Sequence, residues 1–151
     1  MTDNNTFLGN IEAEEAILGG ILLDPQAISI VADMLPVEAF CLQTHQLIYK
    51  TALELYQKDK PTDLMAVSTR LADHKLLEKV GGTTKLSQLI NRTVSAVNID
   101  RYAGLIFNKY QRRQLVQVGH EIVELGYDTT AELETIFDAS EEKIFHLTTN
   151  G

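Results

Sequence analysis

The segment from Asp100 to Leu125 contains neither a proline nor a pattern that caps a helix end. About 25 helical residues span about 37 Å, which is long for a chain of this size. Gly126 follows as a glycine of the kind that ends helices. Thr129 then opens a capping-box pattern, from which a second helix starts. The sequence therefore predicts a helical hairpin with its tip near Tyr127.

Breakers divide the preceding part of the chain into shorter amphipathic segments: Asp24-Pro25, Pro36 and Pro61-Thr62-Asp63. Between them, apolar residues return to one side of a 3.6-residue spiral. No alternating pattern longer than three or four residues predicts a strand. We expect an all-α fold, with a compact bundle of five or six short helices over residues 1–97. A long antiparallel helical hairpin is expected over residues 98–149.

Some residues indicate how the short helices begin and pack. Asn10 predicts the N-cap of the first helix. Val80-Gly81-Gly82 predicts a turn, after which Thr83 caps another helix. Gly19-Gly20 lies inside a helical pattern, where small residues indicate close packing against a second helix.

Charge and apolar runs restrict the environment of the chain. It has 13 Lys and Arg against 21 Asp and Glu, and its net charge of −8 disfavours binding to nucleic acid or anionic membrane. The single cysteine, Cys41, is interpreted as a small buried side chain, which fits a reducing compartment. No apolar run approaches the ~20 residues of a membrane span, and the first ten residues lack the regions of a signal peptide. We expect a cytoplasmic protein with no membrane contact.

The patterns that support catalysis are missing from the sequence. The glycines at 81–82 lack the spacing of a phosphate-binding loop, and His120-Glu121 has no second histidine four residues on. His45 is interpreted as a satisfied, half-buried histidine. The carboxylates of residues 12–15 are interpreted as a charge cluster at a helix start rather than an acid–base pair. We expect no enzyme activity, no cofactor and no metal site in this chain.

Apolar residues of the hairpin point in more directions than one partner helix covers. Leu105, Ile106 and Phe107 are consecutive, and successive helical residues point 100° apart. Ile136-Phe137 repeats this on the return helix. The second face packs either on the bundle or, as we favour, on another copy in a two-fold dimer. The residues predicted for the dimer interface are Leu105, Ile106, Tyr110, Leu133, Phe137 and Ile144.

Charge also distinguishes the two hairpin segments, since a basic stretch at 101–113 precedes an acidic one at 121–143. If the chain folds back at Asp128, antiparallel helices bring the two stretches together. Exposed pairs of this kind contribute about 0.2–1 kcal/mol each and select the register. The residues predicted to form them are Arg112, Arg113, Glu141 and Glu142. The basic stretch leaves an alternative function open, that of a stand-alone helical regulator that binds nucleic acid through residues 101–113.

An ordered set of short motifs runs along the chain. It begins with Ile11-Glu12-Ala13-Glu14, Ile17-Leu18-Gly19-Gly20 and Leu22-Leu23-Asp24. It continues with Phe40, His45, Ile48-Tyr49, Pro61-Thr62-Asp63, Val67, Leu71, Val80-Gly81-Gly82, Asn98-Ile99, Tyr102-Ala103, Arg112-Arg113-Gln114-Leu115, Glu141 and Ile144-Phe145. Over residues 8–147 this order resembles the amino-terminal domain of bacterial DnaB-type replicative DNA helicases. Two departures are Leu8-Gly9-Asn10, where a proline-containing lead is usual, and Ser140, where alanine is usual.

The resemblance implies a helical head and a hairpin, joined in the whole protein to a RecA-like ATPase motor beyond residue 151 that uses ATP and Mg²⁺. It implies that hairpins pair and that three pairs close the collar of a hexameric ring. The activity implied for the parent protein is ATP-dependent 5'-3' unwinding of duplex DNA at the replication fork, with single-stranded DNA bound only by the full hexamer.

Two further partners follow from the same resemblance. A DnaG-type primase docks on the collar, and a helicase loader acts on the ring. Exposed apolar residues at a hairpin end suit the capture of a partner. The residues predicted for primase docking are therefore Leu125, Tyr127 and Asp128.

Overall fold

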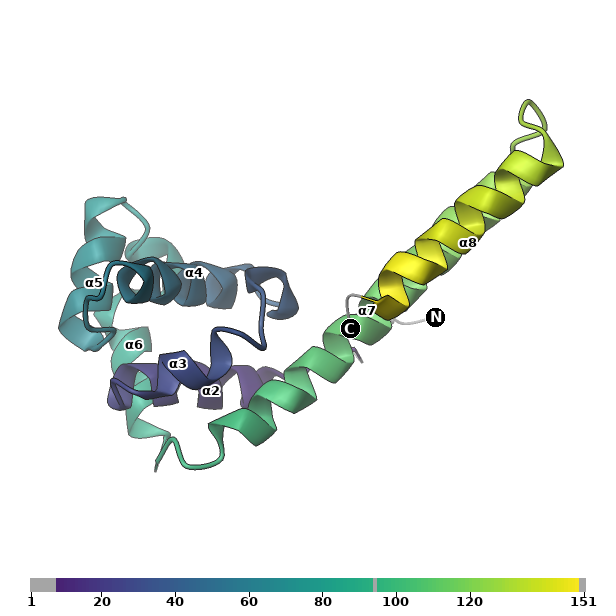
Figure 1. The fold of residues 1–151 in the computed structure, drawn as a ribbon. Coiled ribbons are helices and arrows are strands. Elements are labelled where there is room, and N and C mark those ends of the chain that lie inside the picture. The colour runs from purple at the N-terminus through teal and green to yellow at the C-terminus, as the bar shows by residue number, and fades with distance from the viewer. Residues whose placement is uncertain (1–7, 94, 150–151) are drawn as a thin grey trace. The chain divides into compact units, whose positions relative to one another are not determined.

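The computed structural model describes residues 8–93 and 95–149, and every regular element within them is helical (Figure 1). The elements are α2 (Ile11–Leu23), α3 (Ala27–Val31), η1 (Val37–Ala39), α4 (Gln43–Gln57), α5 (Leu64–Asp73), η2 (Glu78–Val80), α6 (Gly82–Asn91), α7 (Ile99–Tyr127) and α8 (Leu133–Thr149). The predicted all-α fold, with short helices followed by a long helical hairpin, is confirmed. Most of the segment examined for a signal peptide, residues 1–7, lies outside the described residues.

The chain divides into two compact units, and the boundary between Lys109 and Tyr110 falls inside α7. The first unit, here called the head, contains α2 to α6 and the beginning of α7. The second, here called the hairpin unit, contains the remainder of α7 together with α8. The sequence places a subdomain boundary at about Asn98, one residue before α7 begins, and that division stays a prediction.

Side chains cap the starts of α2 and α5 in the head. The Asn10 side chain accepts a hydrogen bond from the backbone N–H of Ala13 at 3.0 Å, so the predicted N-cap is confirmed. Thr83 is not an N-cap, because α6 already begins at Gly82. The preceding Gly81 has a φ of 107°, which completes the turn one residue earlier than expected.

The core of the head is apolar and gathers around two aromatic rings. Phe40 and Tyr49 are fully buried, with ring centroids 4.6 Å apart. The Tyr49 hydroxyl donates to the carbonyl of Leu35 at 2.7 Å, and burial raises the pKa of this phenol. A buried hydroxyl needs a hydrogen-bond partner, so this bond holds the segment that follows α3 against α4.

A buried polar contact joins α2 to α4. Glu14 and His45 are each 1% exposed, with Oε1 and Nδ1 2.8 Å apart, and Glu14 Oε2 accepts from the backbone N–H of Cys41 at 2.8 Å. Glu14 is therefore not part of an exposed helix-start cluster, because its position on α2 faces α4. The interpretation of His45 as a satisfied histidine is confirmed, although it is fully buried. Cys41 is half-buried rather than fully buried.

The closest helix approach in the head is that of α2 to the α6 end. A Cβ added to Gly19 would lie 2.4 Å from the carbonyl oxygen of Leu89 and 2.0 Å from Thr93 Oγ1. The predicted packing role of Gly19 is confirmed. Beside it, Glu15 accepts from Lys85 and Arg92 at 2.8 Å each, and the bond from Lys85 lowers the pKa of the Glu15 carboxyl.

We expect Gly19→Ala to destabilise the head by about 1–3 kcal/mol, because the added methyl group overlaps backbone that is held by α6. Gly104→Ala is a matched control, since a Cβ there meets nothing within 4 Å and alanine favours a helix by about 1 kcal/mol over glycine. Urea unfolding of both variants checks this. Equal free energies of unfolding for the two variants would contradict the packing argument.

Candidate protein interface

The two helices of the hairpin unit contact each other through inner surfaces that carry both apolar and charged residues. Ile136 is buried, and Lys143 Nζ on α8 donates to Glu121 Oε1 on α7 at 2.7 Å. Gln117 Nε2 donates to the other oxygen of Glu121 at 3.0 Å. These two hydrogen bonds, the lysine's first, lower the pKa of the Glu121 carboxyl. Glu121 and Lys143 therefore mark positions that lie opposite each other in the antiparallel pair.

The hairpin turns later than the sequence predicts. α7 continues through Gly126 to Tyr127, and Gly126 does not adopt the left-handed backbone of a terminating glycine. Thr129 does not start α8, which begins at Leu133. Instead, Asp128 accepts from the backbone N–H of Thr130 at 3.0 Å and also from its hydroxyl. This turn extends the connection over residues 128–132.

The later turn changes the charge pairing between the helices. With Glu121 opposite Lys143, the positions of Arg112 and Glu141 differ by about 16 Å along the axis at 1.5 Å per residue. The register therefore disfavours the predicted pairing of Arg112 and Arg113 with Glu141 and Glu142. Glu142 instead lies 3.6 Å from His146 on its own helix. An ion pair between the two helices joins Glu121 and Lys143.

One side of the hairpin carries large exposed apolar side chains. Leu133, Phe137 and Ile144 are 63%, 56% and 40% exposed and lie within about 40° of one another around α8. On α7, Leu115 is 55% exposed. When each helix is viewed along its own chain direction, these residues lie to the same rotational side of the surface that faces the other helix. Because the two helices are antiparallel, both sets of residues then lie on one common side of the hairpin. We call this surface the apolar face; it consists of Leu115, Gly119, Gly126, Leu133, Phe137 and Ile144.

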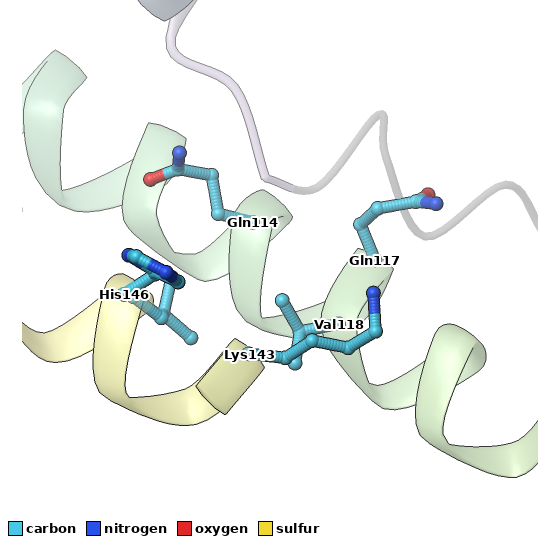
Figure 2. Close-up of a pocket in the computed structure, with 6 residues that line it drawn as sticks. Gln114, Gln117, Val118, Lys143 and His146 are labelled. Atoms are coloured by element: carbon cyan, nitrogen blue, oxygen red, sulfur yellow. The ribbon is translucent and has the colours of Figure 1, made fainter. Parts of the chain in front are cut away.

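The opposite side of the hairpin is polar. A hollow of about 250 Å³ lies there between the helices, lined by Gln114, Gln117, Val118, Lys143, His146 and Leu147. Figure 2 shows the two glutamines on α7 and the lysine and histidine on α8. Because Lys143 is already paired with Glu121, this hollow does not present a free cation. The two sides of the hairpin therefore differ in chemistry, one apolar and one hydrogen-bonding.

The predicted interface residues do not all lie together. Leu133, Phe137 and Ile144 share the apolar face, whereas Leu105 and Ile106 belong to the head. Ile106 is 1% exposed and does not fit the prediction, because its side chain is part of a core. Tyr110 is half-buried and accepts a hydrogen bond from Gln114 at 3.1 Å. Leu115 and the two glycines were not among the predicted residues, and their spacing on α7 is the signal that identifies them.

The tip presents a different surface. Tyr127 is 82% exposed, and Asp128 is exposed beside it. The hydroxyl and the backbone N–H of Thr130 lower the pKa of the Asp128 carboxyl, so a negative charge is fixed at the tip. Leu125 is half-buried and contributes less surface. The tip thus combines one aromatic ring with one carboxylate, and its docking role stays a prediction.

The expectations about membrane spans and metal sites can be compared with the part of the chain that the structure describes. No helix there combines the length and the apolar character needed to cross a membrane. No three side chains among its His, Cys, Asp and Glu residues converge in a way that suits a metal ion. In the basic stretch, the Arg113 guanidinium lies over the Tyr110 ring, 5.8 Å from its centroid.

The described chain is thus a helical head followed in sequence by a hairpin with an exposed apolar side. Residues 7–108 match the family model described as the DnaB-like helicase N terminal domain. The chain therefore belongs to this family, and the predicted resemblance is confirmed. The match extends over the head, while the apolar face lies beyond it.

Relatives extend the similarity to the hairpin. The chain is 60% identical over 139 residues to the replicative DNA helicase DnaB of Synechocystis sp., covering 92% of this chain and 16% of that protein. It is 36% identical over 138 residues to the replicative DNA helicase DnaC of Bacillus subtilis, covering 91% of this chain and 30% of that protein. The chain thus spans less than a third of the length of these relatives.

Solved structures agree with the fold. The crystal structure of the N-terminal domain of DnaB helicase from Mycobacterium tuberculosis matches with a TM-score of 0.86 at 31% identity, covering 91% of this chain and 97% of that one. A DnaB-like replicative helicase, whose structure was described with its interactions with primase, matches with a TM-score of 0.80 at 22% identity. That match covers 94% of this chain and 32% of the other, and at this identity it supports the fold alone.

The lowered pKa of Glu121 makes hairpin stability depend on pH. The ion pair stabilises the folded hairpin above the ordinary carboxyl pKa of 4.5, and this contribution is lost as the pH falls through the lowered value. We expect Lys143→Met to lower the melting temperature at pH 7 and to have a smaller effect at pH 3. Thermal unfolding at both pH values measures this, with Lys60→Met at an exposed head position as control. An effect of Lys143→Met that is the same at both pH values would rule out this role for the pair.

Proposed function

We propose that this chain is the oligomerisation and primase-docking domain at the amino terminus of a replicative DNA helicase. Two copies pair through the apolar faces of their hairpins, and three pairs close the collar of a hexameric ring. The observation that carries this proposal is the apolar face itself, on which Leu133, Phe137 and Ile144 stand 40–63% exposed in the isolated chain. The replicative helicases among its relatives support it.

A second copy is the simplest cover for this face. Burial of apolar surface contributes roughly 25 cal/mol per Å², so side chains of this size favour association strongly when they are covered together. A two-fold axis brings the same patch of two molecules into contact, so each residue of the apolar face acts in both halves of the interface. One type of surface therefore supplies the whole contact.

The activity of the whole protein belongs to the same proposal. Relatives named as replicative helicases are several times longer than this chain, which spans 16–30% of them. We place ATP-dependent 5'-3' unwinding, with its ATP and Mg²⁺, in a motor domain outside residues 1–151. Single-stranded DNA is then bound by the full ring, and a loader acts on that ring. The role of this domain is architectural rather than catalytic.

Primase docking is assigned to the hairpin tip. Tyr127 offers a rigid aromatic ring at 82% exposure, and Asp128 offers a fixed carboxylate next to it. Aromatic residues with such exposure are frequent anchors of protein interfaces. The structure of a fold relative that was described with its interactions with primase supports this choice of partner. The alternative of a stand-alone nucleic-acid regulator has no comparable support, since the chain carries the helicase family's domain.

The pairing proposal predicts that charges on the apolar face prevent association. Phe137→Asp combined with Ile144→Asp places two carboxylates where apolar side chains meet, while both positions are exposed in the single chain. We expect a folded monomer, seen by sedimentation equilibrium across a concentration series together with an unchanged circular dichroism spectrum. Thr135→Asp, at an exposed position of α8 that points away from Phe137, is the matched control and should leave the dimer intact. A dimer of unchanged mass in the double variant would refute pairing through this face.

The docking proposal predicts that Tyr127→Ala weakens binding to a DnaG-type primase by about 10-fold or more, because an interface anchor of this kind contributes about 1–2 kcal/mol or more. Isothermal titration calorimetry with the purified primase measures the affinity. Tyr56→Ala, at a 38% exposed tyrosine in the head, is the control. If the affinity is the same for wild type and Tyr127→Ala, the docking surface lies elsewhere.

A further inference from the structure

In the hairpin unit, two glycines interrupt the exposed surface of α7 without any reason inside the chain; Gly104 has a similarly open environment on the part of α7 that belongs to the head. A Cβ added to Gly119 or Gly126 would meet no heavy atom within 4 Å. In the head, by contrast, a Cβ on Gly19 would overlap Thr93 and Leu89. Glycine weakens the interior of a helix relative to alanine. Within the single chain, both positions of α7 would therefore be better filled by a larger residue.

Both glycines lie on the apolar face. They are seven residues apart, so they point in directions only about 20° apart around α7. Phe137 and Ile144 on α8 are also seven residues apart, and both are exposed on the same side. The register set by Glu121 and Lys143 places Gly126 nearly level with Phe137, and Gly119 nearly level with Ile144. The face thus has two levels about 10 Å apart along the helix axis. At each level α7 has a glycine and α8 has a large apolar side chain.

We propose that Gly119 and Gly126 form two notches that receive apolar side chains from the same face of a second copy. This inference rests on the proposed pairing of hairpins and specifies how closely the two molecules approach. A two-fold interface requires a surface that complements itself, and a face that carries both gaps and projections at equal spacing meets that requirement. The absence of a side chain at each notch lets the second hairpin pack directly on the backbone of α7, where dispersion contacts are dense.

The proposal separates the stability of one chain from the stability of the dimer. A larger residue at either notch leaves the single hairpin folded, because the space around it is open, and strengthens α7 as a helix. The same residue fills the space that the second copy needs. Substitution should therefore raise the melting temperature of the monomer and weaken the dimer. A residue that served only the fold of its own chain would not give these opposite signs.

The test compares Gly119→Leu with Gly126→Leu, alone and combined, against Gln117→Leu, which adds a leucine on the polar side of the same helix. Sedimentation equilibrium gives the dimer Kd. We expect each glycine variant to raise it about 10-fold and the pair about 100-fold or more, with no change for Gln117→Leu. Thermal unfolding at a concentration where all variants are monomeric should give melting temperatures no lower than that of wild type.

The other outcomes overturn the proposal in distinguishable ways. If the combined glycine variant dimerises like wild type, the notches are not filled by a second copy, although pairing through the hairpin still holds. If that variant keeps its dimer and loses affinity for primase, the partner in the notches is primase. If wild type is monomeric throughout the concentration series, the proposed pairing itself fails. If Gln117→Leu disrupts the dimer equally, the effect does not belong to the apolar face.

Discussion

A pair of antiparallel helices buries only one side of each helix, and the hairpin unit depends on how the remaining sides are made. On the inner side, Ile136 and the ion pair between Glu121 and Lys143 hold the helices in register. Of the outer sides, one is lined by glutamine, lysine and histidine, and the other carries leucine, phenylalanine and isoleucine. Because a two-layer structure lacks a third layer to cover the apolar side, we propose that another molecule covers it.

The head was predictable where short-range chemistry decides the structure. Asn10 caps α2 through its own side chain, and the glycines at 81–82 make the expected turn, since both effects involve neighbours in sequence. Glu14 was misinterpreted because its partner, His45, is 31 residues away. A carboxylate in the first turn of a helix has the same local pattern whether it faces solvent or an imidazole. Only the packing of α2 against α4 distinguishes the two.

For the apolar face, the sequence indicated its helices and some of its residues. Phe137 and Ile144 were identified because their spacing on α8 is regular. Ile106 was included because three consecutive apolar residues sweep more than one direction, and the sequence does not show which of those directions the head occupies. The end of α7 and the start of α8 were placed too early, because Gly126 resembles a terminating glycine and Thr129 resembles the start of a capping box, whereas the Asp128 turn precedes α8. This shift of a few residues in the turn separates the partners of the expected charge pairs by several helical turns along the hairpin axis.

The hydrogen-bonded side of the hairpin has a consequence for the size of the assembly. Its lysine and its two glutamines already donate to groups of their own hairpin, so a further hairpin that approached from this direction would have to desolvate polar groups without an apolar gain. The polar side therefore disfavours the stacking of a further hairpin on a pair that has formed through the apolar faces. An open fibre needs two adhesive surfaces on every subunit and is therefore disfavoured, so the proposed association of hairpins would stop as a closed pair.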